Sequence, residues 1–307
     1  MAPPTRTRVV PLGDDRVMTV DDMGRPDGAP VLYLHGTPDS RLARHPDDEL
    51  AAAAGVRLLA VDRPGYGGTS PTPGPWTDTW PGAVAADVAT VLDAIGVERC
   101  AVLAWSGGAL TGVALAAALP DRVDGLGIVA GLVPRQAFDD PAVRTAGESR
   151  LGMIELADAV PPGTLGDEVA PLLAPFPCDM ALAAEHQAGQ RSAIDAAELA
   201  AVPGGAERMA AGLVEAVRPG LAGVAADVEA QARPLALDLA SVRCPVHLWY
   251  GEDDEVAPPA FGRWYAARLP GATLTVVGAA GHYVAFTRWS EMLATLAATV
   301  SPGARPG

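Results

Sequence analysis

The sequence predicts an α/β fold, in which helices cover both faces of a mostly parallel sheet. Short apolar runs such as 30–34, 56–61 and 100–104 have the length and composition of buried parallel strands, and helix-like patterns separate them. The chain has 307 residues, of which 49% are hydrophobic, so it is long enough for one large domain with a substantial insertion. Together these observations favour a sheet domain in which strands and helices alternate.

The predicted elements follow one another in a regular order. Residues 8–22 predict a β-hairpin that turns at Gly13-Asp14-Asp15. After the hairpin, strands are predicted at 30–34, 56–61, 100–104, 126–133, 245–250 and 273–277, and helices at 40–54, 80–95, 109–119, 258–269 and 284–300. Alternating units of this kind imply parallel strands whose carboxyl ends lie at one edge of the sheet, where functional loops gather.

The alternation stops between residues 135 and 234. This stretch is rich in alanine, carries prolines throughout and offers no convincing strand, so we expect a set of short helices there. Residues 1–134 and 235–307 are then expected to form the sheet domain, and residues 135–234 an inserted helical cap, or lid. An insertion at this point of the chain emerges beside the carboxyl ends of the strands and would roof a site formed there.

The composition excludes several classes of function. Lys and Arg total 22 against 37 Asp and Glu, a net charge of −15, so the chain should repel nucleic acids and anionic membranes. The N-terminus lacks the apolar core of a signal peptide, and no long apolar run predicts a membrane span, which favours a soluble cytoplasmic protein. The five histidines and three cysteines show no metal-binding spacing, so neither a metal nor a cofactor is expected. The sequence gives no indication of the oligomeric state.

The central motif is Ala104-Trp105-Ser106-Gly107-Gly108, between a predicted strand and a predicted helix. Small residues two positions before and after Ser106 suit a sharp turn that lifts the serine hydroxyl clear of the sheet, beside the N–H groups at the start of the helix. The motif resembles the nucleophile elbow of the α/β-hydrolase family, with Ala104 where glycine is usual. This resemblance implies an α/β-hydrolase fold with Ser106 as the nucleophile.

Three further motifs carry the resemblance, in the family's chain order. His35-Gly36-Thr37-Pro38 is similar to the oxyanion loop, Gly251–Pro258 to the acid loop, and Gly281-His282 to the motif with the catalytic histidine. The resemblance implies a triad of Ser106, Asp254 and His282. It also implies an oxyanion hole formed by the backbone N–H groups of Thr37 and Gly107. The loop motifs at 35–38 and 62–70 loosely resemble those of proline iminopeptidases, whose elbow has a different sequence.

Some assignments within these motifs stay open. Residues 252–255 are all acidic, so Asp253 and Glu255 compete with Asp254 for the role of the acid. A carboxylate after the earlier strand, at Asp139 or Asp140, is a further alternative. His35 precedes the serine in the chain, whereas the catalytic histidine of this family comes last, so we expect His35 to pack beneath its loop.

These residue types indicate hydrolysis through an acyl-enzyme. A serine hydroxyl needs a base to take its proton, and an ionised carboxylate fixes the tautomer of that base. We therefore expect a serine hydrolase that cleaves an ester, lactone, thioester or small amide. A second hypothesis uses the triad for C–C bond hydrolysis, acyl transfer, or a cyclisation or elimination step in a biosynthetic pathway. A third is a small-molecule receptor with slow turnover. Relatives that open epoxides or haloalkanes carry aspartate in place of the serine.

The predicted cap should select the substrate. We expect it to form an apolar roof over Ser106, which favours a small-molecule substrate of the apolar acyl or lactone type. The residues expected to line this roof are Phe138, Leu151, Met153, Phe176 and Met180 from the cap, with Trp105 or Tyr283 from the core. An anionic substrate would instead require an inward-turned arginine, such as Arg135, Arg144 or Arg150.

Overall fold

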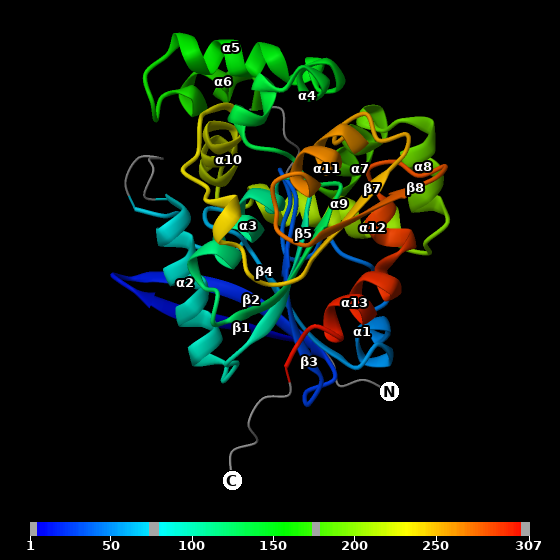
Figure 1. The fold of residues 1–307 in the computed structure, drawn as a ribbon. Helices are drawn as coiled ribbons and strands as arrows, with labels where there is room; N and C mark the ends of the chain where they lie inside the picture. Colours follow the sequence, from blue (N-terminus) through cyan, green and yellow to red (C-terminus); the bar gives the residue numbers. More distant parts are fainter. Residues whose placement is uncertain (1–4, 74–79, 174–178, 302–307) are drawn as a thin grey trace.

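An eight-stranded sheet lies at the centre of the computed structural model, which describes residues 5–73, 80–173 and 179–301 (Figure 1). The strands lie in the order β1-β2-β4-β3-β5-β6-β7-β8. β2 pairs antiparallel with β1 and β4, and the pairs from β4 to β8 are parallel, which confirms the predicted sheet. The strands are β1 (Arg6–Gly13), β2 (Arg16–Gly24), β3 (Ala29–Leu34), β4 (Val56–Val61), β5 (Cys100–Trp105), β6 (Val123–Val129), β7 (Val246–Gly251) and β8 (Ala272–Val277).

Helices cover both faces of the sheet, as Figure 1 shows. α2 (Trp80–Ala94) and α3 (Gly108–Ala118) pack on one face, and α1 (Glu49–Ala53) and α13 (Trp289–Ala297) on the other. α11 (Pro259–Ala266) packs against β7 and β8. Every residue of β5 and β6 is buried, because both faces of these strands are covered. Double burial explains why the central strands are continuous apolar runs in the sequence.

The helix predicted over 40–54 is wrong for most of its length, since only α1 at Glu49–Ala53 is helical. Carboxylates hold the backbone at the start of this segment, and a proline interrupts its middle. Asp39 accepts from the N–H of Ser40, and Asp62 accepts from the N–H of Arg41. Pro46 has no N–H to donate within a helix. The segment before α1 is therefore a loop, held in part by Asp62 from the end of β4.

Two other predicted boundaries differ from the structure. The strand expected over 126–133 is β6, at Val123–Val129, and it ends where Ala130 takes a left-handed conformation with φ of 47°. The closing helix expected over 284–300 is divided at Arg288 into α12 (Val284–Thr287) and α13. These differences leave the order of the elements unchanged.

The chain between β6 and β7 is helical in the part that the structure describes, and Figure 1 shows these helices grouped at one end of the sheet. Short 3-10 turns lie at Arg135–Asp139, Glu148–Arg150 and Leu239–Ser241. The α-helices are α4 (Pro141–Ala146), α5 (Leu151–Ala159), α6 (Leu165–Leu173), α7 (Met180–Gln190), α8 (Ala193–Ala200), α9 (Gly205–Val217) and α10 (Ala222–Ala232). No single helix among the described residues has the length and apolar character needed to cross a membrane. The pair α9 and α10 meets both criteria only when taken together, across a bend of 98°.

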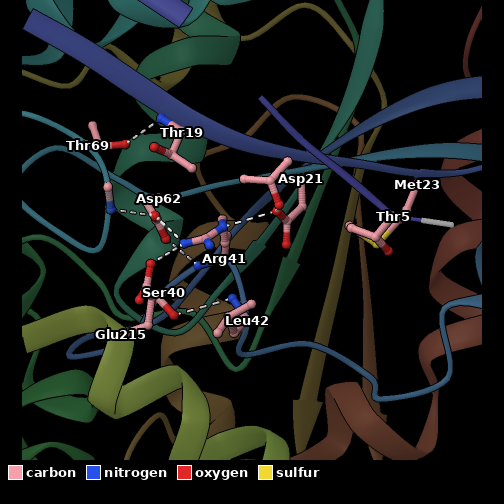
Figure 2. Close-up of polar contacts among 12 residues, drawn as sticks. Thr5, Thr19, Asp21, Met23, Ser40, Arg41, Leu42, Asp62, Thr69 and Glu215 are labelled. Carbon is pink, nitrogen blue, oxygen red and sulfur yellow. Dashed lines mark hydrogen bonds and ion pairs between the residues drawn. The ribbon is translucent and has the colours of Figure 1, made fainter. Parts of the chain in front are cut away.

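An ion-pair cluster around Arg41 joins these helices to the sheet domain. Figure 2 shows Arg41, in the loop after β3, between Asp21 of β2, Asp62 after β4 and Glu215 of α9. The closest N–O distances are 3.1, 2.7 and 2.6 Å, in that order. One guanidinium has enough donors to serve several carboxylates at once. Arg41 therefore holds α9 against the loops that follow β3 and β4.

Candidate active site

Ser106 occupies a sharp turn between β5 and α3. Its backbone has φ of 54°, a left-handed conformation that residues other than glycine rarely adopt. A Cβ atom on Gly108 would lie 2.6 Å from the carbonyl oxygen of Leu34, so only glycine fits two positions after the serine. Strained backbone of this kind gathers at functional sites. The turn therefore has the geometry expected of a nucleophile elbow.

Ala104, where the family pattern usually has glycine, is accommodated by a glycine on α3. A Cβ atom on Gly112 would lie 2.8 Å from the Cβ atom of Ala104, which is closer than two such carbons pack. The missing side chain of Gly112 thus leaves room for the methyl group of Ala104. Helix and strand keep their close packing with one methyl group between them.

Ser106, His282 and Asp254 form a continuous chain of hydrogen bonds. The Oγ atom of Ser106 lies 3.0 Å from Nε2 of His282, and Nδ1 of His282 lies 2.9 Å from Oδ2 of Asp254. The carboxylate can only accept, so Nδ1 carries the proton and Nε2 is free to accept from the serine hydroxyl. This tautomer is the one that a general base for Ser106 requires.

The electrostatic surroundings favour a cationic state of His282 once it takes a proton. Burial lowers the pKa of His282, but the surrounding carboxylates together raise it more, Asp254 most of all through its charge and hydrogen bond, and the net pKa lies above its ordinary value. The carboxylates of Asp195 and Glu198 raise it further. The site is therefore arranged to stabilise an imidazolium formed during a reaction.

Asp254 is the buried member of the acidic run 252–255. Its Oδ1 atom accepts from the backbone N–H groups of Val256 and Ala257, both at 2.8 Å. Its neighbours Asp253 and Glu255 are exposed. Asp139 and Asp140 belong to the inserted segment, where Asp140 accepts from the N–H of Ala142 at the start of α4. Asp254 is thus the carboxylate of the sequence-predicted candidates that contacts His282.

The oxyanion loop predicted at 35–38 lies directly against the elbow. A Cβ atom on Gly36 would lie 3.1 Å from Cβ of Ser106, and one on Gly107 would lie 2.2 Å from Oγ1 of Thr37. In the described part of the chain, no protein acceptor takes the backbone N–H of Thr37 or of Gly107. Two N–H groups beside a serine hydroxyl match the arrangement that binds an oxyanion.

His35 lies beneath this loop and has no contact with the triad. Its Nδ1–H donates to the carbonyl oxygen of Gly36 at 2.8 Å, and its Nε2 accepts from the N–H of Arg63 at 2.9 Å. Burial, together with the nearby charge of Arg63, lowers the pKa of His35 well below its ordinary value. A neutral imidazole bonded on both sides is a structural element of the loop, in agreement with the sequence-based interpretation.

A buried ion pair that the sequence does not predict fixes Thr37. The guanidinium of Arg63 lies 2.6 Å from Asp227 of α10, and it also donates to the carbonyl oxygens of His35 and Gly36. Thr37 donates its hydroxyl to the same Asp227 carboxylate. One carboxylate of the inserted helices therefore anchors the loop that carries the candidate oxyanion donor.

Helix α8 makes a second contact that sequence reasoning missed. The backbone N–H of His282 donates to Oδ1 of Asp195 at 2.7 Å, and that of Tyr283 donates to Oε2 of Glu198 at 3.1 Å. A Cβ atom on Gly281 would lie 2.2 Å from Oδ1 of Asp195, so glycine is required for this approach. Ser192 and Asp195 form a capping box, which a sequence pattern can suggest, but no local pattern reveals the bond to His282.

A cavity of about 440 Å³ opens beside Ser106, between the sheet domain and the helices α7, α9 and α10. Trp105 and Tyr283 line it, as expected. Its other lining residues are Gly36, Thr37, Pro38, Asp39, Ser106, Leu132, Arg150, His186, Gln187, Arg191, Asp195, Met209, Leu213, Gln231, Val256 and His282. Polar and charged groups thus make up much of the wall.

Four of the cap residues expected to form an apolar roof are described by the structure, and none of these four lines the cavity. Phe138 is buried against Phe261, with ring centroids 5.9 Å apart. Leu151 packs on the main core and Met153 on a smaller cluster around Ala157. Met180 is 46% exposed, and Phe176 lies outside the described residues. Phe138, Leu151 and Met153 pack in hydrophobic clusters instead, a role that a list of apolar residues cannot distinguish from pocket lining.

A metal site is not formed by the residues that the structure describes, where no three His, Cys, Asp or Glu side chains are grouped to hold an ion. Cys100 is buried in β5 and Cys244 is partly buried, and burial raises the pKa of both thiols. Neither thiol is therefore a reactive thiolate near neutral pH.

Comparison with known proteins agrees with this fold. RutD of a Caulobacter species, provisionally named a carbamate hydrolase, is 28% identical over 230 residues, 74% of each chain. An alpha/beta hydrolase fold protein from Nakamurella multipartita superimposes with a TM-score of 0.62 at 27% identity, covering 95% of this chain and 99% of that one. The esterase RhEst1 from a Rhodococcus species gives 0.62 at 19% identity, with 97% and 99% coverage. The sequence model of the alpha/beta hydrolase family matches residues 31–296. The chain therefore belongs to the alpha/beta hydrolase family.

Proposed function

We propose that this protein is a serine hydrolase that cleaves a small-molecule ester, lactone, thioester or small amide through an acyl-enzyme. The observation that carries the proposal is the hydrogen-bonded chain from Asp254 through His282 to Ser106, which ends at a strained turn inside a cavity. The related proteins described as an esterase and a carbamate hydrolase support a reaction at a carbonyl carbon.

In the first half-reaction, Ser106 is the nucleophile. His282 Nε2 takes the hydroxyl proton while Oγ attacks the substrate carbonyl carbon, and Asp254 stabilises the resulting imidazolium. The negative charge that develops on the carbonyl oxygen is received by the N–H groups of Thr37 and Gly107. Losing one such donor typically costs about 2.7–4 kcal/mol of transition-state stabilisation. His282 then gives its proton to the leaving alcohol or amine, and the acyl group remains on Ser106.

In the second half-reaction, a water molecule replaces the leaving group. His282 takes a proton from the water as the oxygen attacks the acyl carbon, and the same two N–H groups receive the charge. Collapse of the tetrahedral intermediate returns the proton from His282 to Ser106 and releases the acid. No metal or cofactor takes part in these steps.

Residues 135–234 act in this proposal as the cap of the site. Helices α7, α9 and α10 supply His186, Met209 and Gln231 to the cavity wall, opposite the loops of the sheet domain. The aliphatic part of a substrate finds apolar contacts at Trp105 and Leu132. A lidded cavity of this kind restricts water and positions the substrate carbonyl near Ser106.

The test is the substitution Ser106→Ala, assayed with p-nitrophenyl butyrate. We expect kcat to fall by at least about 10⁴-fold, because no nucleophile remains, while the fold is retained. The matched control is Ser290→Ala, which removes an exposed hydroxyl from α13 and should hydrolyse the ester at the wild-type rate. A kcat for Ser106→Ala within about tenfold of wild type rejects the nucleophile.

Fluorophosphonate labelling combined with an ester assay separates the hydrolase from its two rivals, which share one outcome. The hydrolase is expected to be labelled at Ser106 and to release acid from the ester. A receptor with slow turnover would be labelled without releasing acid at a useful rate. A triad devoted to cyclisation or elimination would be labelled and would leave simple esters intact.

A further inference from the structure

Two arginines line the cavity that contains Ser106. Arg150 lies immediately before α5, and Arg191 lies immediately after α7. The chain as a whole has a net charge of −15, so positively charged side chains beside Ser106 are opposite in sign to the net charge of the chain. The positive charge of these two side chains indicates that the cavity suits a negatively charged group, which the rest of the surface repels.

Arg150 is partly buried and has no anionic partner in the described part of the chain. One of its terminal nitrogens donates to Oε1 of Gln231 at 2.7 Å, and this partner is neutral. None of the ion pairs among the described residues includes Arg150. A guanidinium offers five N–H donors in a planar fork, so most of its capacity is available to a ligand.

Burial lowers the pKa of Arg150 to about 10, and no neighbouring carboxylate offsets this effect. The side chain is still cationic near neutral pH. A cation taken out of water without a counter-ion is costly unless a ligand supplies the opposite charge. Of the other two arginines named in the sequence analysis, Arg135 pairs with Asp158 at 3.2 Å, and Arg144 is exposed on α4.

The position of Arg150 relates it to the reacting atoms. Gln231, which accepts from Arg150, donates through Nε2 to Oγ1 of Thr37 at 3.0 Å. A Cβ atom on Gly107 would also lie 3.0 Å from Nε2 of Gln231. Arg150 is therefore two hydrogen bonds away from the loop that carries the candidate oxyanion donors. A ligand bound to its guanidinium can place another functional group at Ser106.

The second arginine, Arg191, adds positive charge and is held by neutral groups. Arg191 stacks over the ring of Tyr283 at 5.3 Å and donates to Gln187 at 2.7 Å. Two acids line the cavity as well, but neither pairs with Arg150. Burial raises the pKa of Asp39 well above its ordinary value, which favours the neutral carboxyl, and Asp195 accepts from the N–H of His282.

We propose that Arg150 binds a carboxylate of the substrate, so that the enzyme hydrolyses esters or lactones that carry a second, free carboxylate. A guanidinium fork matches a carboxylate with two parallel N–H···O bonds. The apolar wall at Trp105 and Leu132 then accommodates the chain between this carboxylate and the scissile carbonyl. The inference rests on the hydrolase function proposed above and names the class of its substrate.

The kinetic test uses two matched pairs of esters. Monoethyl adipate and ethyl hexanoate differ only in a terminal carboxylate on the acyl side, and the hexanoyl esters of 4-hydroxybutyrate and of butanol differ in the same way on the alcohol side. We expect wild type to prefer the anionic member of at least one pair by about tenfold or more in kcat/KM, at both low and moderate salt. Arg150→Gln should lower that preference by about 10- to 100-fold, as expected for the loss of a charged hydrogen bond.

Three further variants make the result specific. Arg150→Lys keeps the charge but loses the fork, so its preference should lie between those of wild type and Arg150→Gln. Arg144→Gln removes an exposed arginine of α4 that does not line the cavity, and it should retain the wild-type preference. A preference for the uncharged member of both pairs overturns the proposal. So does a preference that survives in Arg150→Gln and is lost in Arg191→Gln.

A binding measurement separates this inference from the hydrolase function. Adipate is titrated calorimetrically into the Ser106→Ala protein, and into the same protein carrying Arg150→Gln as well. We expect the second variant to bind adipate at least about tenfold more weakly. Equal affinity for the two proteins overturns the role of Arg150, even if wild type hydrolyses esters. Loss of affinity with Arg150→Gln upholds it, even if wild type hydrolyses none of the four esters.

Discussion

The two carboxylate oxygens of Asp254 accept hydrogen bonds from different groups, one from its own loop and the other from the candidate base. Oδ1 accepts from the N–H groups of Val256 and Ala257, and Oδ2 accepts from His282. An asparagine has one accepting oxygen, so it cannot satisfy both sets of donors. Either the loop loses its bonds or the imidazole turns to the wrong tautomer.

Asp254→Asn is therefore expected to lower kcat by on the order of 10⁴-fold, the size seen when a triad imidazole is held in the wrong tautomer. The matched control is Asp253→Asn, which changes an exposed neighbour that makes no bond to His282. Steady-state kinetics of the two variants on one ester measures the difference. If Asp253→Asn were the more damaging change, the acid would be misassigned by one position.

At the scale of single residues, the sequence predicted the groups that belong to local motifs. Ser106, Asp254 and His282 each follow a strand within a recognisable pattern, and the structure brings them into one hydrogen-bonded chain. Arg150 and Asp227 belong to no motif, and their partners lie 81 and 164 residues away in the chain. Contacts of this kind depend on how helices pack, which a single sequence does not encode in any local pattern.

Helix α8 is an element whose importance comes from its position against His282. Its first turn presents Asp195 to the backbone N–H of His282, and the next turn presents Glu198 to that of Tyr283. Residues three positions apart share a helix face, so both carboxylates reach the same loop. The inserted helices thus position the candidate base from outside the sheet domain.

We expect the charge on α8 to set the pH at which His282 becomes neutral. The group must be neutral to accept the serine proton, so kcat/KM rises with pH through the pKa of His282 and is lost below it. Asp195 and Asp254 both raise this pKa. Asp195→Asn keeps an accepting oxygen but removes the charge, and should move the acid limb of the pH profile to lower pH.

The measurement must allow for a second group on the same helix. Burial raises the pKa of Glu198 to about 7, so its titration overlaps that of His282. The pH profiles of the proteins with and without Asp195→Asn are therefore compared in a Glu198→Gln background. Asp195→Ala, which also removes the acceptor, should lower the plateau kcat by up to about 100-fold, the effect of a misplacement of about 1 Å. Glu185→Gln, an exposed change on α7, is the control. If the acid limb of the kcat/KM profile stays in place or moves to higher pH with Asp195→Asn, this role for α8 is contradicted.

Secondary structure was predictable where burial alone determines it. The central strands are buried on both faces, and their apolar runs gave their positions to within a few residues. The loop before α1 was mistaken for a helix although Pro46 interrupts the segment, and its start is fixed by Asp62, a residue 21 positions beyond Arg41. A local sequence pattern is enough to place the buried strands, and it is not enough to identify the loop before α1.

At the scale of the whole molecule, ion pairs hold the helices between β6 and β7 against the loops of the central sheet. Arg41 pairs with Glu215 of α9 (Figure 2), and Arg63 pairs with Asp227 of α10. Arg63 and Asp227 are buried, and breaking a buried ion pair by removing one partner typically costs about 3–5 kcal/mol, whereas the Arg41 pair is only partly buried. Such contacts keep the helices over the cavity. The cavity-lining side chains of these helices therefore keep a fixed position relative to the candidate triad.

The central claim is that a covalent acyl-enzyme forms on Ser106, and intact-protein mass spectrometry tests it most directly. The protein is mixed with p-nitrophenyl butyrate, quenched in acid within milliseconds, weighed, and digested to locate the added mass. We predict one butyryl group per chain, on the peptide that contains Ser106, formed before the steady state and absent from Ser106→Ala. Steady turnover of the ester by wild type, with no acyl group on Ser106 at any quench time or with the acyl group on another residue, would contradict the account.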